Sequence, residues 1–150
     1  MNTKDIARIL SSDPYTKGMV CEVLDGVHAS DQLHEPTTRP STMVVNTDES
    51  WKPGRHWVSI FIPLSGQWEY FDSFGKPPDS PFIQTFLQHK KIKFNSKVLQ
   101  SDKSSVCGHY CIYYLVHRVR GFTMETIVNR FGKDKERNDR DVHDFVVDQF

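Results

Sequence analysis

Residues 104–116, Ser-Ser-Val-Cys-Gly-His-Tyr-Cys-Ile-Tyr-Tyr-Leu-Val, are the stretch from which the fold can be read. After Cys107 this segment is apolar nearly all round rather than along one stripe, which predicts a helix buried on several sides. Ser104 and Ser105 are residue types that cap helix N-termini. We therefore expect a central helix with Cys107 in its first turn and a domain packed around it.

Short β-branched and aromatic runs predict a sheet beside this helix. Met43–Val45, Trp57–Ile62 and Trp68–Phe71 are bounded by Pro, Gly, Asn or Asp, and the break at residues 63–66 is short enough for an antiparallel hairpin. A fourth strand is expected at Lys93–Leu99. The predicted fold class is α+β, with a mixed sheet packed by helices.

Amphipathic patterns predict four further helices, and two segments read as irregular. The apolar faces are Ile6, Ile9 and Leu10; Phe82, Phe86 and Leu87 after the cap Ser80 and Pro81, as far as His89; Met124, Ile127, Val128 and Phe131 between Thr123 and Gly132; and Val142, Phe145 and Val146 after Asp141. We expect a long polar loop at residues 26–40 and a solvated charged connection at residues 133–140.

Composition limits the class of protein. The 150 residues are expected to form one domain, and 19 Lys and Arg against 19 Asp and Glu disfavour a dedicated nucleic-acid binder. Apolar runs are too short to span a membrane and the first residues have no signal-peptide core, so we expect an intracellular protein. Three cysteines disfavour a disulfide framework, so a free thiol needs an explanation.

Cys107 is the candidate nucleophile. A helix N-terminus favours a thiolate over a thiol, which lowers the pKa of a cysteine placed there. The alternative is that a cysteine in an apolar helix is only a small core residue. Cys111, one turn deeper, and Cys21, in the apolar run Met19–Cys21, fit that alternative better than Cys107 does.

A cysteine nucleophile needs a base from another element. His109 lies about 200° around the helix from Cys107, and His117 lies roughly 15 Å along it, so neither can reach the sulfur. His56 follows a Pro-Gly turn and opens a predicted strand, where a side chain can point into a cleft. The other histidines are expected to be solvated, in loops or on polar helix faces: His28, His34, His89 and His143.

Two more residues complete a catalytic set. Asp72 ends the strand that we pair with the strand of His56, so its carboxylate could orient the imidazole, although a turn aspartate is the alternative. Gln100 lies seven residues before Cys107, and its amide could face the same carbonyl as the backbone N–H of Cys107. Base, orienting carboxylate, oxyanion donor and nucleophile together point to acyl transfer.

Several sequence blocks, in this order, carry a resemblance to a known family. They are Pro14-Tyr15 with Gly18, Val45-Asn46-Thr47, Gly54-x-His56-Trp57, Tyr70-Phe71-Asp72-x-Phe74-Gly75, Gln100, and Cys107-Gly108-x-x-Cys111, over about 100 residues. The chain resembles the adenovirus maturation protease (adenain) family, in the cysteine-peptidase clan that also contains the proteases of SUMO and other ubiquitin-like modifiers. The resemblance implies a papain-like arrangement in which helix and sheet form opposite walls of the cleft.

The resemblance also implies roles for individual residues. The catalytic residues would be Cys107 as nucleophile, His56 as general base, Asp72 as third member and Gln100 as oxyanion donor. Trp57 and Gly108 would take part in substrate binding. The implied activity is a cysteine endopeptidase that cleaves viral or virus-like capsid precursors at Gly-containing sites, without a cofactor. The alternative is a deubiquitinase or a protease specific for a ubiquitin-like modifier.

Partners and regulation follow from the same resemblance. The expected partners are polypeptide substrates, either capsid precursors or modifier conjugates, and the expected protein is a monomer in the host nucleus, the cytoplasm or the virion. Adenain is activated by DNA and by a disulfide-linked peptide, but residues 51–100 contain no cysteine, so covalent peptide activation is not expected. A lysine-rich segment could contact DNA or an acidic partner, or could simply be a solvated face; its lysines are Lys90, Lys91, Lys93, Lys97 and Lys103.

A metal-binding module is a further alternative. Cys107 and Cys111 lie one helical turn apart, but no CxxC pair or second Cys/His cluster accompanies them. We therefore expect no metal site.

Overall fold

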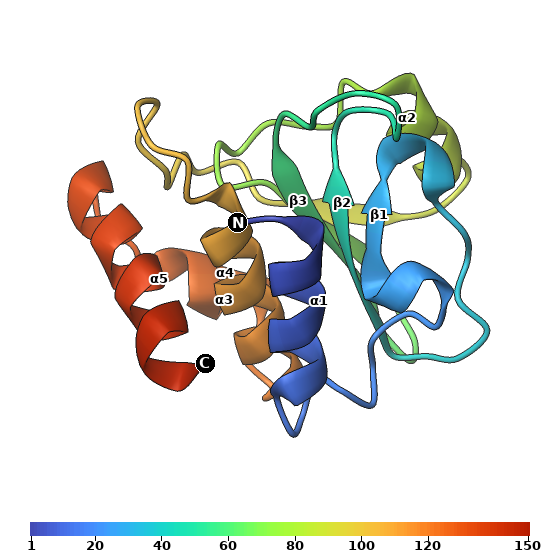
Figure 1. The fold of residues 1–150 in the computed structure, drawn as a ribbon, viewed down its shortest axis with the longest axis horizontal. Coiled ribbons are helices and arrows are strands. Elements are labelled where there is room, and N and C mark those ends of the chain that lie inside the picture. Colours follow the sequence, from blue (N-terminus) through green and yellow to red (C-terminus); the bar gives the residue numbers. More distant parts are fainter.

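The computed structural model describes residues 1–150 as a five-stranded mixed sheet with helices on both faces (Figure 1). The strands lie side by side in chain order: β1 (Val27–Ala29), β2 (Ser41–Asn46), β3 (Trp57–Ile62), β4 (Trp68–Phe71) and β5 (Ile92–Phe94). The central strand β3 runs antiparallel to both of its neighbours, β2 and β4, whereas β1 runs parallel to β2 and β5 runs parallel to β4. The expected α+β class and the β3–β4 hairpin are confirmed.

Five helices and two short 3₁₀ turns complete the chain. The helices are α1 (Thr3–Ser12), α2 (Pro81–Leu87), α3 (Cys107–Val119), α4 (Met124–Asn129) and α5 (Lys135–Gln149), and the 3₁₀ turns are Val23–Gly26 and Ser30–Gln32. In Figure 1, α1, α3, α4 and α5 lie on one side of the sheet. None of these helices is long and apolar enough to cross a membrane.

Each face of the sheet has its own apolar core. Alternate strand residues such as Val44, Phe61 and Phe71 pack against the helical layer, in which Tyr110 and Ile112 of α3 are fully buried. On the opposite face Met43, Ile60 and Tyr70 pack with Ile83 and Leu87 of α2. The prediction of a central buried helix is confirmed, because α3 contacts β3, α1, α4 and α5.

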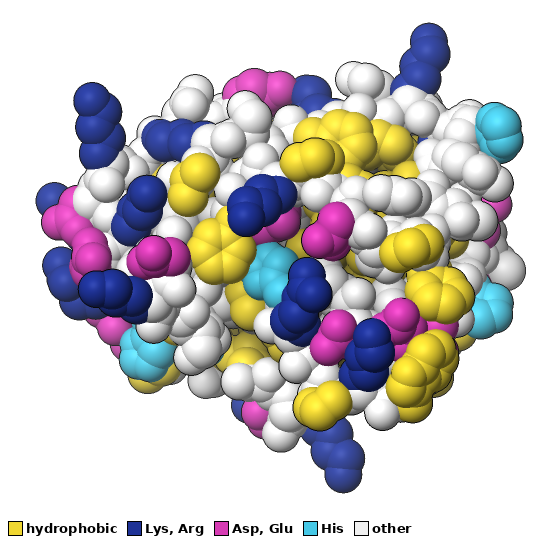
Figure 2. Space-filling model, turned by 90° about the horizontal axis from the view of Figure 1, so that it is seen from above, with side chains coloured by type: hydrophobic (Ala, Val, Ile, Leu, Met, Phe, Trp, Pro, Cys, Tyr) yellow, Lys and Arg dark blue, Asp and Glu magenta, His cyan; other side chains and the backbone are white.

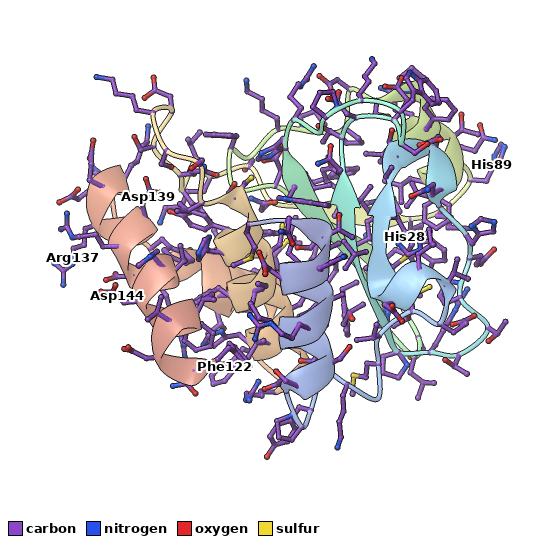
Figure 3. All side chains as sticks on the ribbon, viewed as in Figure 1. His28, His89, Phe122, Arg137, Asp139 and Asp144 are labelled. Atoms are coloured by element: carbon purple, nitrogen blue, oxygen red, sulfur yellow. The ribbon has the colours of Figure 1, made fainter.

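The first segment predicted to be irregular contains a strand. Within residues 26–40, β1 pairs in parallel with β2, and His28 lies opposite Val45. A three-residue strand has too short a pattern to be recognised, and its pairing with β2 supplies the stability that its own sequence lacks. His28, labelled on β1 in Figure 3, is only 1% exposed, so the prediction of a solvated histidine in a loop was wrong.

The second such segment is mostly helical. α5 already begins at Lys135, within the predicted connection, with the Asp134 side chain as its N-cap. Asn138 is buried, donates to the carbonyls of Leu99 and Gly132, and accepts from the N–H of Gly132. These residues are polar and carry no apolar period, so only the cap and the contacts of Asn138 define the helix start.

Two predicted elements differ in detail. In α2, the buried residues are Ile83 and Leu87, whereas Phe82 stays 42% exposed, so the predicted apolar face was rotated. The fourth strand ends at Phe94 rather than at Leu99. Beyond β5, Asn95 forms hydrogen bonds with Asp72, and the N–H groups of Leu99 and Gln100 donate to the Ser73 carbonyl. This segment therefore lies against the residues that follow β4.

Candidate active site

A cleft of about 970 Å³ opens where β2 ends, β3 begins and α3 starts. It is lined by five of the residues expected to act in catalysis or substrate binding: His56, Trp57, Asp72, Gln100 and Cys107. Figure 2 looks down on this end of the molecule and shows one histidine side chain in a central hollow, bordered by charged and hydrophobic side chains. Residues far apart in the chain thus meet in one depression.

Strand register brings His56 and Asp72 together. Because Ser59 lies opposite Phe71 in the antiparallel β3–β4 pair, the residue before β3 and the residue after β4 reach the same end of the sheet. His56 Nε2 lies 2.9 Å from Asp72 Oδ1, and both side chains are largely buried. The ring nitrogen and the carboxylate are therefore correctly spaced for Asp72 to fix the tautomer of His56.

The backbone around Asp72 is held on both sides. Asn95 accepts from the Asp72 N–H at 2.9 Å and donates to the Asp72 carbonyl at 2.6 Å, as a neighbouring strand would. Asp72 Oδ1 also accepts from the N–H of Phe74, whose ring lies 5.1 Å from the imidazole of His56. A side chain at Gly75 (φ +67°) would lie 2.5 Å from the Ser96 carbonyl, so only glycine fits the end of this turn.

Cys107 is the first residue of α3. Its N-cap is Val106, which provides no side-chain cap, so Ser104 and Ser105 do not cap this helix as predicted. The backbone N–H of Trp57 donates to Cys107 Sγ at 3.4 Å. The residue before Trp57, His56, lines the same cleft as Cys107. The sequence did not indicate the Trp57 contact, because it depends on β3 lying beside the start of α3.

The two reactive groups stabilise each other's charged forms. Burial alone would lower the pKa of His56, but its hydrogen bonds and charge interactions with Asp72 and Cys107 raise that pKa to about 9. Burial likewise opposes a Cys107 thiolate, yet the hydrogen bonds from His56 and from the Trp57 N–H, with the charge of His56, lower the pKa of Cys107 overall. The arrangement therefore favours a thiolate–imidazolium pair.

Gln100 is 2% exposed and has a defined orientation. Its Oε1 accepts from the Ser73 hydroxyl at 2.6 Å, and its Nε2 donates to the carbonyl and hydroxyl of Ser104 at 3.2 Å and 3.1 Å. Gln100 and Ser104 both line the cleft with Cys107. The N–H₂ group of Gln100 therefore lies beside Ser104, a residue that lines the cleft, and is a candidate oxyanion donor.

Trp57 and Gly108 occupy different kinds of position. Trp57 lines the cleft, and its Nε1 donates to the Met1 carbonyl at 3.3 Å. Gly108 is buried and does not line the cleft; a Cβ built on it would lie 3.4 Å from the Trp57 ring. The structure therefore places Gly108 under Trp57, as a packing position, rather than at the surface where a substrate would bind.

Asn46 lines the cleft and belongs to the Val45-Asn46-Thr47 block, to which the sequence assigned no role. Its Oδ1 accepts from the N–H groups of Asp48 and Arg55, at 2.9 Å and 3.1 Å, and so joins both ends of the loop that leads to His56. Residues of this loop line the cleft, as do Met1, Asn2 and Thr3. The hydrogen bonds of Asn46 could not be read from the sequence, because they depend on the folded shape of the loop.

The remaining cysteines are packing residues. All three cysteines are free, and Cys21 and Cys111 are buried. Burial raises the pKa of both thiols, that of Cys111 well above its usual range. Of the three thiols, Cys107 is the one that lines the cleft.

The other buried histidines are held in their neutral form. Burial, with the nearby charge of His34, lowers the pKa of His28 to about 4, and burial, with His143, lowers that of His109 to about 4. The His117 Nδ1 lies 2.7 Å from the Tyr113 carbonyl oxygen.

The structure contains no group of three or more His, Cys, Asp or Glu side chains placed to hold a metal ion.

Three lysines of the basic segment already have partners. Lys90 lies 4.6 Å from the centre of the Trp68 ring, Lys93 pairs with Glu125 at 2.6 Å, and Lys97 donates to the Phe131 carbonyl. Three of the five lysines therefore contact other parts of the protein.

Comparison with known proteins finds viral cysteine proteases. No protein-family model matches the chain. The chain is 36% identical over 89 residues to a cysteine protease of African swine fever virus, and 31% identical over 106 residues to a protein of another isolate named as a SUMO-1 cysteine protease. It is 29% identical over 120 residues to a thiol protease of Acanthamoeba polyphaga mimivirus.

The alignments cover a larger share of this chain than of its relatives. The three alignments cover 51%, 62% and 72% of this chain but only 33%, 39% and 39% of the relatives. The crystal structure of a selenomethionine form of the African swine fever virus protease aligns with a TM-score of 0.47 and 28% identity, over 73% of this chain and 46% of that chain. This chain is therefore similar to part of viral cysteine proteases, and it spans less than half the length of the relatives.

Proposed function

We propose that this protein is a cysteine peptidase in which Cys107 is the nucleophile and His56 the general acid and base. The observation that carries the proposal is that one cleft is lined by Cys107, by His56 and by Asp72, with the His56 ring nitrogen 2.9 Å from the Asp72 carboxylate. The similarity to viral cysteine and thiol proteases supports the same chemistry.

The reaction would proceed in two acyl-transfer steps. The Cys107 thiolate attacks the scissile carbonyl carbon, and the Cys107 N–H and Gln100 Nε2 donate to the resulting oxyanion. The C–N bond then breaks, and the His56 imidazolium gives its proton to the leaving amine, which leaves a thioester on Cys107. In the second step neutral His56 takes a proton from a water molecule that attacks the thioester, and the carboxylate product and Cys107 are released.

Two substrate classes fit this chemistry. By its resemblance to adenain, the protein would cleave viral or virus-like capsid precursors beside Gly, with Trp57 flanking the bound chain. The second class is a conjugate or precursor of a ubiquitin-like modifier, which is favoured by the name SUMO-1 cysteine protease carried by a relative. Both are polypeptides, and an extended polypeptide segment is what the open cleft could hold.

The first experiment compares turnover of short Gly-containing peptides and of full-length SUMO fusions, each with and without DNA. Cleavage of the short peptides supports the capsid-precursor class, whereas cleavage restricted to the intact fusion supports a modifier protease. Stimulation by DNA would make the lysine-rich segment, residues 90–103, a candidate activator surface.

Two cysteine variants test the nucleophile. Cys107→Ala should remove all cleavage while keeping the circular dichroism spectrum and melting temperature close to wild type, because Cys107 is only partly buried. Cys111→Ala should keep activity but lose about 1 kcal/mol of unfolding free energy, because it leaves a small void in the core. Cleavage by a Cys107→Ala protein would refute the assignment.

A further inference from the structure

The turn Asp72–Phe74 contacts both the proposed base, His56, and the proposed oxyanion donor, Gln100. Asp72 binds His56, the Phe74 ring packs on His56, and between them the Ser73 hydroxyl donates to Gln100 Oε1 at 2.6 Å. Ser73 is 2% exposed and does not line the cleft, so it has no direct access to a substrate.

The hydrogen bonds define which way the Gln100 amide faces. The Ser104 carbonyl can only accept, so the atom of Gln100 that lies 3.2 Å from it must be the N–H₂ nitrogen. The other end of the amide is then the oxygen, and the Ser73 hydroxyl must donate to it. This leaves the donor end of Gln100 beside Ser104, on the wall of the cleft.

Backbone contacts keep Ser73 opposite Gln100. The Ser73 carbonyl accepts from the N–H groups of Leu99 and Gln100, at 2.9 Å and 3.1 Å. Asn95 holds the preceding residue, Asp72, through both of its backbone groups. The hydroxyl is therefore presented by a rigid turn rather than by a mobile loop.

We propose that Ser73 is a positioning residue that orients the Gln100 amide so that its N–H₂ group faces the developing oxyanion. The inference rests on the proposed peptidase function. Without the hydroxyl, Gln100 Oε1 is buried with no partner, and the amide can rotate and present its oxygen to the oxyanion. The loss should then appear in kcat rather than in KM, because the oxyanion exists only after attack.

A double-mutant cycle tests this role. Gln100→Ala should lower kcat by ~10² to 10³, the effect of losing one oxyanion donor, and Ser73→Ala should lower kcat by about tenfold or more with little change in KM. Adding Ser73→Ala to Gln100→Ala should cause almost no further loss, because Ser73 acts only through the Gln100 side chain. Ser73→Thr keeps the hydroxyl and should restore most of the kcat.

Other outcomes would refute the role of Ser73. Losses that multiply in the double variant would show that Ser73 acts independently of Gln100. A shifted pH profile or a slower alkylation of Cys107 by iodoacetamide in Ser73→Ala would show that Ser73 acts through Asp72 and His56. If Ser73→Ala does not fold, Ser73→Cys replaces it with the same expectations, since a thiol of similar size is a weak donor.

The wild-type protein separates failure of this inference from failure of the proposed function. If wild type and Cys107→Ala are equally inactive on peptides and fusions, the peptidase function fails. If wild type cleaves and Ser73→Ala matches it in kcat, only the role of Ser73 fails.

Discussion

At the scale of single residues, the pKa values of His56 and Cys107 shift in opposite directions. The pKa of His56 is raised to about 9 and that of Cys107 is lowered, so the charged pair exists between the two values. Below the lowered pKa of Cys107 the thiolate is lost by protonation. Above about 9, His56 loses the proton that the leaving amine needs.

These pKa shifts predict a bell-shaped dependence of kcat/KM on pH. The rate should rise with pH through the lowered pKa of Cys107 and fall as pH rises through about 9. Asp72→Asn removes a charge that raises the pKa of His56, so its alkaline limb should move to lower pH, while Cys111→Ala should keep both limbs. Peptide turnover measured across pH 4 to ~10 checks this, and an unmoved alkaline limb in Asp72→Asn would contradict it.

At the scale of elements, a loop joins β2 to β3 and delivers His56 to the cleft. Asn46, at the end of β2, accepts hydrogen bonds from the N–H groups of Asp48 and Arg55, near the two ends of this loop. A Cβ on Gly54 (φ +102°) would lie 2.9 Å from Asn46 Nδ2, so the loop passes very close to the Asn46 side chain. The Asn46 side chain thus joins the two ends of the loop, beside the hydrogen bond from the Thr47 N–H to the His56 carbonyl.

Removal of the Asn46 side chain should make the position of His56 less well defined. Asn46→Ala leaves two backbone N–H groups without their acceptor, which should cost about 1 to 2 kcal/mol of unfolding free energy and lower kcat/KM. Asn46→Asp keeps an acceptor oxygen and should stay closer to wild type in both measurements. Urea unfolding and peptide turnover check the pair of variants. Equal losses in Asn46→Ala and Asn46→Asp would show that the acceptor oxygen is not what matters.

At the scale of the whole molecule, a buried ion pair joins the sheet to the helical layer. Glu69 of β4 is 5% exposed and accepts from Arg118 of α3 at 2.9 Å and 3.0 Å, and it also accepts from the Tyr114 hydroxyl. Arg118 lies over the Phe61 ring of β3 as well. The pair therefore connects two strands to the helix that carries Cys107, away from the cysteine's own end.

Loss of one partner of this pair should be costly. Arg118→Met leaves the Glu69 carboxylate buried without its cation, and we expect a loss of roughly 3 kcal/mol of unfolding free energy. Lys93→Met breaks the more exposed pair with Glu125 and should cost no more than about 1 kcal/mol. Chemical unfolding compares the two variants directly, and similar losses would mean that burial of Glu69 does not set the energy.

The sequence by itself determined much of the framework and the reactive residue types. Long apolar or alternating runs, such as Trp57–Ile62 and the helix after Cys107, identify their structure because the pattern lies within one segment. The positions of His56 and Asp72 at strand ends, and of Gln100 seven residues before Cys107, also made them candidates for one site. The structure brings all three to the cleft of Cys107.

Only the tertiary structure decided what depends on distant partners. β1 forms because it pairs with β2, and the first turn of α5 forms because of the contacts of Asn138. No local sequence pattern predicts either element. The His56–Asp72 hydrogen bond requires the register of two strands, and the Ser73–Gln100 bond joins residues 27 positions apart. Polar side chains at turns have no periodicity of their own, so their partners are known only once the chain has folded.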